Sequence, residues 1–364
     1  MKISLKYIFA LCALIFLSSC KKNNEPELFT ILIDSYQDEQ VRLSEISEEI
    51  KAIVLEIPDY FYVGDLEKAR VLVSDDYIFL LRNGLGLTSI QLFDCSGKFI
   101  QQIGQAGHDH GKYGGGIYDI AADFENKKLY VQSDYKLICY NFDGTFVKEV
   151  NRIGEYLNFT NNRLTTINSY KVPGDVRDYK ANVVLYEISD DLQIVDSVVL
   201  FSSEANYAEL VKSLDYCHPM TCVDGNMYFY YLFPLMGNNL DSNQDTLYQL
   251  KDDELIPHLR VKLTPGVGNS EKNIRTVYIY RSSRFVFEQH AGERAGIFCY
   301  DLKTMKGKTM SDGYFDDIHG AMKLDNVKLL ASDANKFYYL NKNFRIDMDE
   351  DEPKLTLYIG TLKK

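Results

Sequence analysis

Short runs of alternating apolar and polar residues recur along the chain, each ending in an aromatic residue just before a turn. The clearest example is FDCSGKFIQQIG at residues 93–104, and the same register returns as YNFDGTFVKEVN at residues 140–151. Alternation with a period of two is typical of a half-buried β-strand, and a turn of Asp, Ser and Gly between two such runs indicates a hairpin. The pattern therefore predicts a repeated building unit rather than a site.

The hairpin landmark recurs along the whole chain. The aromatic residues that mark it are Phe93, Tyr140, Tyr186, Tyr248, Tyr300 and Tyr358. Another strand-like run lies upstream of each hairpin, so each repeat holds about four short strands. Four-stranded units without a long amphipathic helix between them are typical of a β-propeller. Six landmarks predict an all-β, six-bladed β-propeller.

The last landmark lies close to the C-terminus and leaves no room for a fourth strand in its repeat. The missing strand is predicted to come from the N-terminal part of the chain, where IKAIVLEI at residues 50–57 has a suitable pattern. Pairing this strand with the last blade would close the ring and remove an exposed sheet edge.

The first twenty residues predict a bacterial lipoprotein signal peptide. Lys2 and Lys6 precede an apolar run over residues 7–17, which is too short to span a bilayer, and LSSC follows as a lipobox. Cys20 is the predicted lipid attachment residue. An ordinary secretory signal with a coincidental cysteine is the alternative.

The chain therefore divides into a signal peptide (1–19), a lipidated polar tether (20–27) and the propeller domain (28–364). We expect a lipid-anchored protein of the cell envelope at the outer membrane. Lys21, rather than Asp, follows the lipidated cysteine and argues against retention at an inner membrane. Whether the domain faces the periplasm or the cell surface is left open.

Composition narrows the class of partner. The 364 residues are 46% hydrophobic and carry a formal net charge of -12, with acidic residues spread along the chain. A dispersed negative charge disfavours a nucleic-acid partner and a broad anionic membrane patch. We expect no nucleic-acid partner and membrane contact through the lipid anchor only.

The chain resembles the six-bladed β-propeller lipoproteins of Bacteroidota, relatives in architecture of the NHL-repeat and TolB-like propellers. The resemblance rests on LSSC, LSEISEEIKAIVLEIP, IQLFDCSGKFIQQIG and KLYVQSDYKLICYNFDGTFVKEV. Members usually carry Gly-Pro-Gly-Glu-Tyr in the loop after the first hairpin. Here HDHGKYGGG has no proline and places Lys112 where the glutamate is expected, so no role of that acid is carried over.

The glycine-rich loop over residues 104–116 is the first candidate for a ligand face. It links the outer strand of one blade to the inner strand of the next and is expected to arrive beside the central channel. The residues of this candidate face are His108, Asp109, His110, Lys112 and Tyr113. Alternate residues on an extended segment point to opposite sides, which favours a solvated loop over a metal or acid–base site.

The segment YCHPMTC at residues 216–222 brings two thiols and an imidazole together. A zinc site needs a second ligand pair, which the sequence lacks, so two structural cysteines are favoured over a metal site. In an oxidising envelope Cys217 and Cys222 are a candidate disulfide, but their spacing does not establish the geometry.

No catalytic residue, metal site or cofactor is predicted, because the sequence lacks a nucleophile elbow, a phosphate loop and a dinucleotide fingerprint. The leading hypothesis is a binding or scaffolding module that presents a loop face to an envelope peptide, glycan or protein. The alternative is a metal-assisted lyase or lactonase, which would require several histidines to converge at the channel mouth. Those histidines are His108, His218, His290 and His319.

Overall fold

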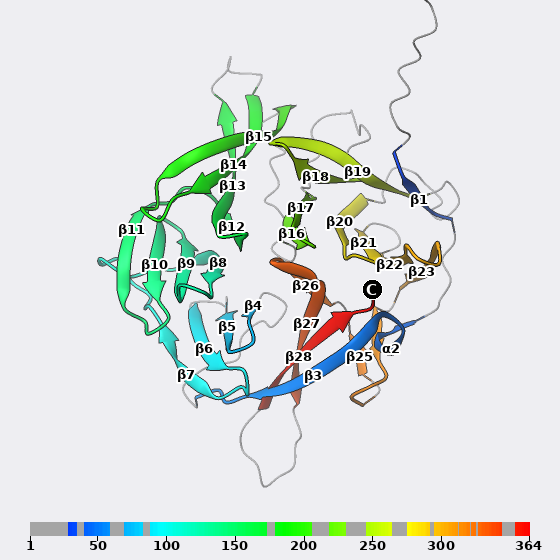
Figure 1. The fold of residues 1–364 in the computed structure, drawn as a ribbon, viewed down its shortest axis with the longest axis horizontal. Helices are drawn as coiled ribbons and strands as arrows, with labels where there is room; N and C mark the ends of the chain where they lie inside the picture. Colours follow the sequence, from blue (N-terminus) through cyan, green and yellow to red (C-terminus); the bar gives the residue numbers. More distant parts are fainter. Residues whose placement is uncertain are drawn as a thin grey trace, which may run out of the picture.

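A computed structural model of the chain describes residues 28–34, 40–58, 69–82, 88–172, 179–205, 218–230, 245–263, 275–291, 295–311, 313–320, 322–324, 327–343 and 354–364. Seven small sheets surround a central axis like the blades of a propeller (Figure 1). No helix in this described part is long and apolar enough to cross a membrane.

The first three blades are consecutive four-stranded meanders. Blade one contains β4 (Arg70–Val73), β5 (Tyr77–Arg82), β6 (Ser89–Asp94) and β7 (Phe99–Ile103). Blade two contains β8 (Ile117–Asp123), β9 (Lys128–Ser133), β10 (Lys136–Asn141) and β11 (Phe146–Asn151). Blade three contains β12 (Tyr156–Thr160), β13 (Arg163–Val172), β14 (Tyr179–Ile188) and β15 (Ile194–Ala205).

The next two blades follow the same plan. Blade four contains β16 (Met220–Val223), β17 (Asn226–Phe229), β18 (Thr246–Lys251) and β19 (Glu254–Leu263), and β1 (Thr30–Ile33) adds a parallel outer strand. Blade five contains β20 (Arg275–Arg281), β21 (Phe285–Ala291), β22 (Gly296–Asp301) and β23 (Lys306–Met310).

The last two blades recruit strands from the N-terminal part of the chain. Blade six is small and contains β24 (Tyr314–Asp316), β25 (Met322–Leu324) and the parallel β2 (Val41–Arg42), which leads into the short helix α2 (Leu43–Ile46). Blade seven contains β26 (Lys328–Leu330), β27 (Asp333–Asn343), β28 (Lys354–Leu362) and β3 (Ser47–Leu55).

The predicted number of six blades is wrong, and the six-bladed part of the family resemblance fails with it. The six aromatic landmarks lie in the third strands of six different sheets, as the hairpin pattern requires. The additional blade, blade six, lies between the landmarks Tyr300 and Tyr358. Its own strands span three residues each, too few to show alternation, and its remaining strand comes from residues 41–42.

Ring closure by an N-terminal strand is confirmed. β3 pairs antiparallel with β28, from Leu55 opposite Leu355 to Ser47 opposite Leu362. The strand covers residues 47–55, whereas the sequence predicted 50–57. Just after β3, the chain also contacts the turn between β6 and β7 of blade one, because Glu56 donates its backbone N–H to the Gly97 carbonyl oxygen at 2.9 Å.

The contact between β3 and the turn of blade one requires glycine at position 97. Gly97 has a φ of +92°, and a Cβ placed on it would lie 2.2 Å from the Val54 carbonyl oxygen. Glycine avoids both the strained conformation and the collision. The turn of blade one can therefore pack directly against the strand that closes the ring.

The two ends of the ring differ in their connections. We call the end at which the innermost strands begin the loop face, because the inter-blade connections 104–116 and 152–155 reach it. We call the opposite end the turn face, because each innermost strand there enters a tight turn, as at residues 74–76 and 124–127. These two names are used below for the two ends of the central cavity.

Candidate ligand site in the central cavity

A cavity of about 630 Å³ occupies the centre of the ring. The innermost strands β4, β8, β12 and β26 supply most of its wall, together with His218 just before β16. Its volume falls within the range of about 300–1,000 Å³ typical of small-molecule sites. It is therefore the leading candidate for a functional site in the described structure.

Asp119 of β8 is the buried centre of a polar network behind the cavity wall. Its side chain has no exposed surface, and its oxygens accept backbone N–H groups of Ile120 at 2.8 Å and Leu157 at 2.7 Å. It also contacts Arg70 Nε at 3.1 Å and His218 Nε2 at 3.0 Å. Four donors from four blades thus satisfy one carboxylate, which suits it to structure rather than to proton transfer.

His218 is held at both ring nitrogens. Its Nδ1 lies 2.7 Å from the Met220 carbonyl oxygen, and its Nε2 lies 3.0 Å from both Asp119 and the Leu157 carbonyl oxygen. The side chain is 8% exposed. The Met220 backbone N–H also lies 3.2 Å from Nδ1, so both ring nitrogens are engaged by protein groups, which fixes the orientation of the ring and leaves neither nitrogen directed at a substrate.

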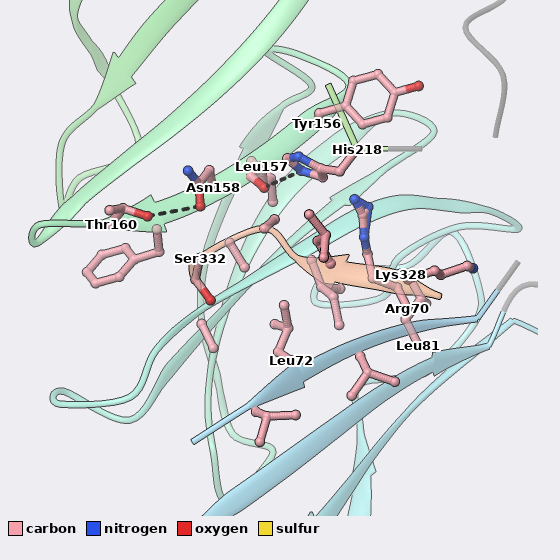
Figure 2. A pocket seen from close by; sticks show the side chains of 18 of the residues that line it. Arg70, Leu72, Leu81, Tyr156, Leu157, Asn158, Thr160, His218, Lys328 and Ser332 are labelled. Carbon is pink, nitrogen blue, oxygen red and sulfur yellow. Dashed lines mark hydrogen bonds between the residues drawn. The ribbon is translucent and has the colours of Figure 1, made fainter. Parts of the chain in front are cut away.

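Two cations line the loop-face end of the cavity. Arg70 begins β4 and Lys328 begins β26, and the Lys328 ammonium donates to the Ala69 carbonyl oxygen at 3.1 Å. Figure 2 shows the imidazole of His218 directed at Leu157, with the guanidinium of Arg70 below the His218 side chain. Asp119 pairs with Nε of Arg70, so this guanidinium is already engaged by a buried carboxylate.

Asn158 of β12 is the other unusual polar residue in the wall. Its side chain is 3% exposed, and its Oδ1 accepts the Thr160 hydroxyl at 3.1 Å. Its Nδ2 has no hydrogen-bond partner among the described residues. An unsatisfied buried donor costs free energy, and because this nitrogen has almost no accessible surface it offers no contact to a molecule in the cavity.

The turn-face end of the cavity has a different character. Asp123 at the end of β8 accepts hydrogen bonds from the backbone N–H and the side-chain amide of Asn126 at 3.0 and 2.8 Å. Glu125 and the exposed Asn161 and Asn162 complete this rim. The cavity therefore runs from a cationic end to an acidic and amide-lined end.

Burial keeps a phenol of the cavity wall neutral. The pKa of Tyr338 rises to about 12, mainly because its side chain is removed from water, and the nearby Arg70 partly offsets this. Its hydroxyl donates to the same Ala69 carbonyl oxygen that Lys328 contacts, at 3.3 Å. The backbone before β4 is thereby fixed, and with it the position of Arg70.

The predicted ligand loop follows a different path from the one expected. Of residues 104–116, Gly116 lines the cavity, whereas the His-Asp-His segment lies over the outer strands of blade two. The His110 Nδ1 lies 3.1 Å from Glu149 of β11, and the Asp109 carbonyl oxygen accepts a hydrogen bond from Lys136 of β10 at 3.1 Å. The side chain of Asp109 pairs with Lys112 at 2.7 Å.

Tyr113 belongs to the core and not to the loop surface. Its side chain is fully buried, and its hydroxyl donates to the Thr88 carbonyl oxygen at 3.2 Å. An aromatic contact to a ligand at this position would need the core to open. His108 is exposed beside Tyr135 at a ring distance of 6.4 Å, and a role in binding stays a prediction for His108 and His110.

Several predicted features lie outside the described residues. Cys20 and the signal peptide precede residue 28, and Cys217 precedes His218, so the lipid anchor and the disulfide stay predictions. Cys222, the other half of the predicted pair, is buried in β16.

The four histidines of the enzymatic alternative occupy different places. His218 lines the cavity, whereas His290 is fully buried in blade five, where its Nδ1 contacts Glu288 at 2.8 Å. His319 lies beside Tyr358 in blades six and seven, and His108 lies on blade two. In the described part of the chain, no three His, Cys, Asp or Glu residues are grouped to hold a metal ion.

The sequence analysis missed Arg70, Asp119, Asn158 and Lys328. Each lies in or begins an innermost strand whose other residues are mostly apolar, as in IYDIAAD over residues 117–123. A polar residue inside such a strand was the available signal. This signal is weak, because polar residues from different strands can be assigned to one site only when the order of the strands around the ring is known.

Comparison with known protein families assigns most of the chain to one family. Residues 28–360 match the family described as "Domain of unknown function (DUF4934)". The chain belongs to this family. A comparison with curated proteins found no significant match.

Solved structures with a similar fold are distant in sequence from this DUF4934 protein. A Bacteroides fragilis protein predicted to be exported has 14% identity and a TM-score of 0.57, over 92% of this chain and 100% of its own. The WD40 domain of Neurospora crassa Pan2 has 10% identity and a TM-score of 0.38, over 81% and 75%. A Bacteroides caccae protein of unknown function has 9% identity and a TM-score of 0.34, over 78% and 89%. The first of these supports the propeller fold alone.

Proposed function

We propose that this DUF4934 protein is a lipid-anchored binding module of the cell envelope that takes an anionic ligand at the loop-face end of its central cavity. The observation that carries the proposal is the pair Arg70 and Lys328 in the wall of a cavity inside a protein of formal net charge -12. Two cationic side chains at one end of a cavity attract an anionic group more strongly than the acidic surface outside does, although Asp119 and Asp134 balance part of their charge.

Binding is favoured over catalysis by the state of the buried groups. Asp119 and His218 are the side chains in the network with acid–base chemistry, and both are already engaged by fixed partners. A general base must instead face the proton that it removes. The envelope location rests on the predicted lipidation of Cys20, and the similar B. fragilis protein is predicted to be exported as well.

Replacing Lys328 with Gln is expected to weaken binding of acidic ligands by roughly tenfold or more, because a charge-assisted hydrogen bond is lost while the polar contact to Ala69 can persist. The measurement is ligand-observed NMR with the full chain in detergent and a mixed set of acidic, neutral and basic sugars and N-acetyl amino acids. Lys148→Gln is the matched control, because Lys148 pairs with Asp191 at the rim of blades two and three. Equal affinity for basic and acidic members would contradict the proposal.

The same assay tests the loop over blade two. If His108→Ala combined with His110→Ala lowers affinity while the fold is retained, the loop extends the ligand face beyond the cavity. Unchanged affinity would show that these residues serve only as a connection.

A further inference from the structure

The middle of the central cavity has an apolar wall. Between the cations of the loop-face end and the acidic and amide rim of the turn-face end, this wall includes Leu72 of β4, Ala122 of β8 and Phe159 of β12. Leu72 and Phe159 are half-buried, so part of each side chain is accessible. Figure 2 shows Leu72 on the opposite side of the cavity from Asn158 and Thr160, the two neighbours of Phe159 in β12. Apolar side chains of three blades therefore border one space.

The small side chains of β8 leave room between the two larger ones. Leu72 packs against the core cluster that contains Ala122, and Phe159 packs against the neighbouring cluster that contains Ala121. Both alanines line the cavity. Because each contributes a single methyl group, β8 fills little of the space between Leu72 and Phe159. A ligand in this space would contact methyl groups below it and larger apolar side chains on either side.

The polar side chains nearest to this space are already engaged. The Oδ1 of Asn158 accepts the Thr160 hydroxyl, and its Nδ2 has almost no accessible surface. Both ring nitrogens of His218 contact protein groups, and Asp123 accepts two hydrogen bonds from Asn126. A ligand hydroxyl placed here would leave water without one of these side chains as a partner, which costs free energy, whereas buried apolar surface contributes favourably. The described wall therefore favours a ligand with an apolar body over a hydroxylated one.

The spacing along β4 connects the apolar space with the cationic end of the cavity. Arg70 and Leu72 are two residues apart in this strand, so they lie on the same side of it and about 6–7 Å apart along it. One small molecule can span that length. We infer that the cavity binds an amphipathic carboxylic acid whose aromatic or branched aliphatic body lies between Leu72 and Phe159. This inference rests on the proposed function and names its ligand class.

Titration calorimetry on the full chain in detergent tests the inference with N-acetylphenylalanine, N-acetylglycine and N-acetylphenylalaninamide. N-acetylphenylalanine is expected to bind roughly tenfold more tightly than N-acetylglycine, because both carry the same carboxylate and only the first has an apolar body. Equal binding of the two acids would overturn the inference and leave the anionic site intact. Equal binding of the amide and its parent acid would refute the anionic site, and the carboxylate with it, but not the apolar contact.

Two further outcomes would also overturn the inference. They are binding of none of the three probes, and tighter binding of methyl β-D-glucuronide than of N-acetylphenylalanine. In either case the wider set of acidic ligands decides separately whether an anionic site exists.

Leu72→Ala tests the position of the apolar body. The affinity for N-acetylphenylalanine is expected to fall roughly fivefold while that for N-acetylglycine is unchanged, because only the first ligand reaches Leu72. Leu340→Ala is the matched control, since Leu340 is a half-buried leucine that packs in the core between blades one and seven. Unchanged affinity for N-acetylphenylalanine in Leu72→Ala, or an equal loss in both variants, would contradict this position.

Discussion

Deleting residues 1–57 is expected to prevent stable folding, whereas deleting residues 1–27 should leave the melting temperature unchanged. The longer deletion removes β1, β2 and β3, which complete blades four, six and seven. It also removes a set of fully or nearly fully buried side chains: Ile31, Ile33, Val41, Leu43, Ile46 and Leu55. At about 1.5–3 kcal/mol for each buried side chain, the loss matches the typical stability of about 5–15 kcal/mol of a whole protein.

Aggregation is the expected form of this failure. Without β3, the edge of β28 that carries Leu355 and Leu357 is left unpaired, and such edges pair with other chains. Circular dichroism melting and size-exclusion chromatography measure both effects. A deletion of residues 1–40, which removes β1 but keeps β2 and β3, should give an intermediate stability. Equal melting temperatures for the 1–27 and 1–57 deletions would refute the role of β3 in closing the ring.

Replacing Asp119 with Ala is expected to lower the free energy of unfolding by about 3–5 kcal/mol, the usual cost of breaking a buried charged pair by removing one partner. Arg70 and His218 would lose their shared acceptor, and the Leu157 N–H would lose its hydrogen bond to the Asp119 carboxylate. Because these donors come from blades one, three and four, the substitution weakens contacts between blades rather than within one. Urea denaturation followed by fluorescence or circular dichroism measures the change.

Asp191→Ala is the matched control for this experiment. Asp191 is 86% exposed and pairs with Lys148 at 2.7 Å, so its loss should change stability little, because water screens an exposed ion pair. Asp119→Asn keeps the size and some acceptor capacity and should fall between the two. If Asp119→Ala and Asp191→Ala proved equally stable, the buried network would not hold the inner strands together.

The repeated strands were predictable because their signal is local. YIFLLR and KLYVQS, which were identified as strand-like runs upstream of the hairpins, coincide with β5 and β9. The aromatic landmarks Phe93 and Tyr140 are buried because alternate residues of a strand face the neighbouring blade, and the turns after them hold glycines with positive φ. These features depend on a few adjacent residues, which any reader of the sequence can inspect.

The site was predicted less well, because its residues meet only through the ring. The sequence analysis named His218 as a candidate, but grouped it with three histidines that the structure places away from the cavity. It did not name Arg70. His218 and Asp119 are 99 residues apart in sequence, yet a hydrogen bond joins them. Such a pairing follows from the order and tilt of the blades, which residue spacing does not contain.

The amino-acid sequence by itself determined that this protein is built of β-hairpins around a closed ring, and that a strand before residue 58 completes the last blade. Period-two alternation and turn residues encode these features over spans of ten residues or fewer. The tertiary structure alone decided that there are seven blades, since blade six is assembled from strands of two and three residues distant in sequence. It also decided where the cations gather, because only ring closure brings the first residues of β4 and β26 to one end of a common cavity.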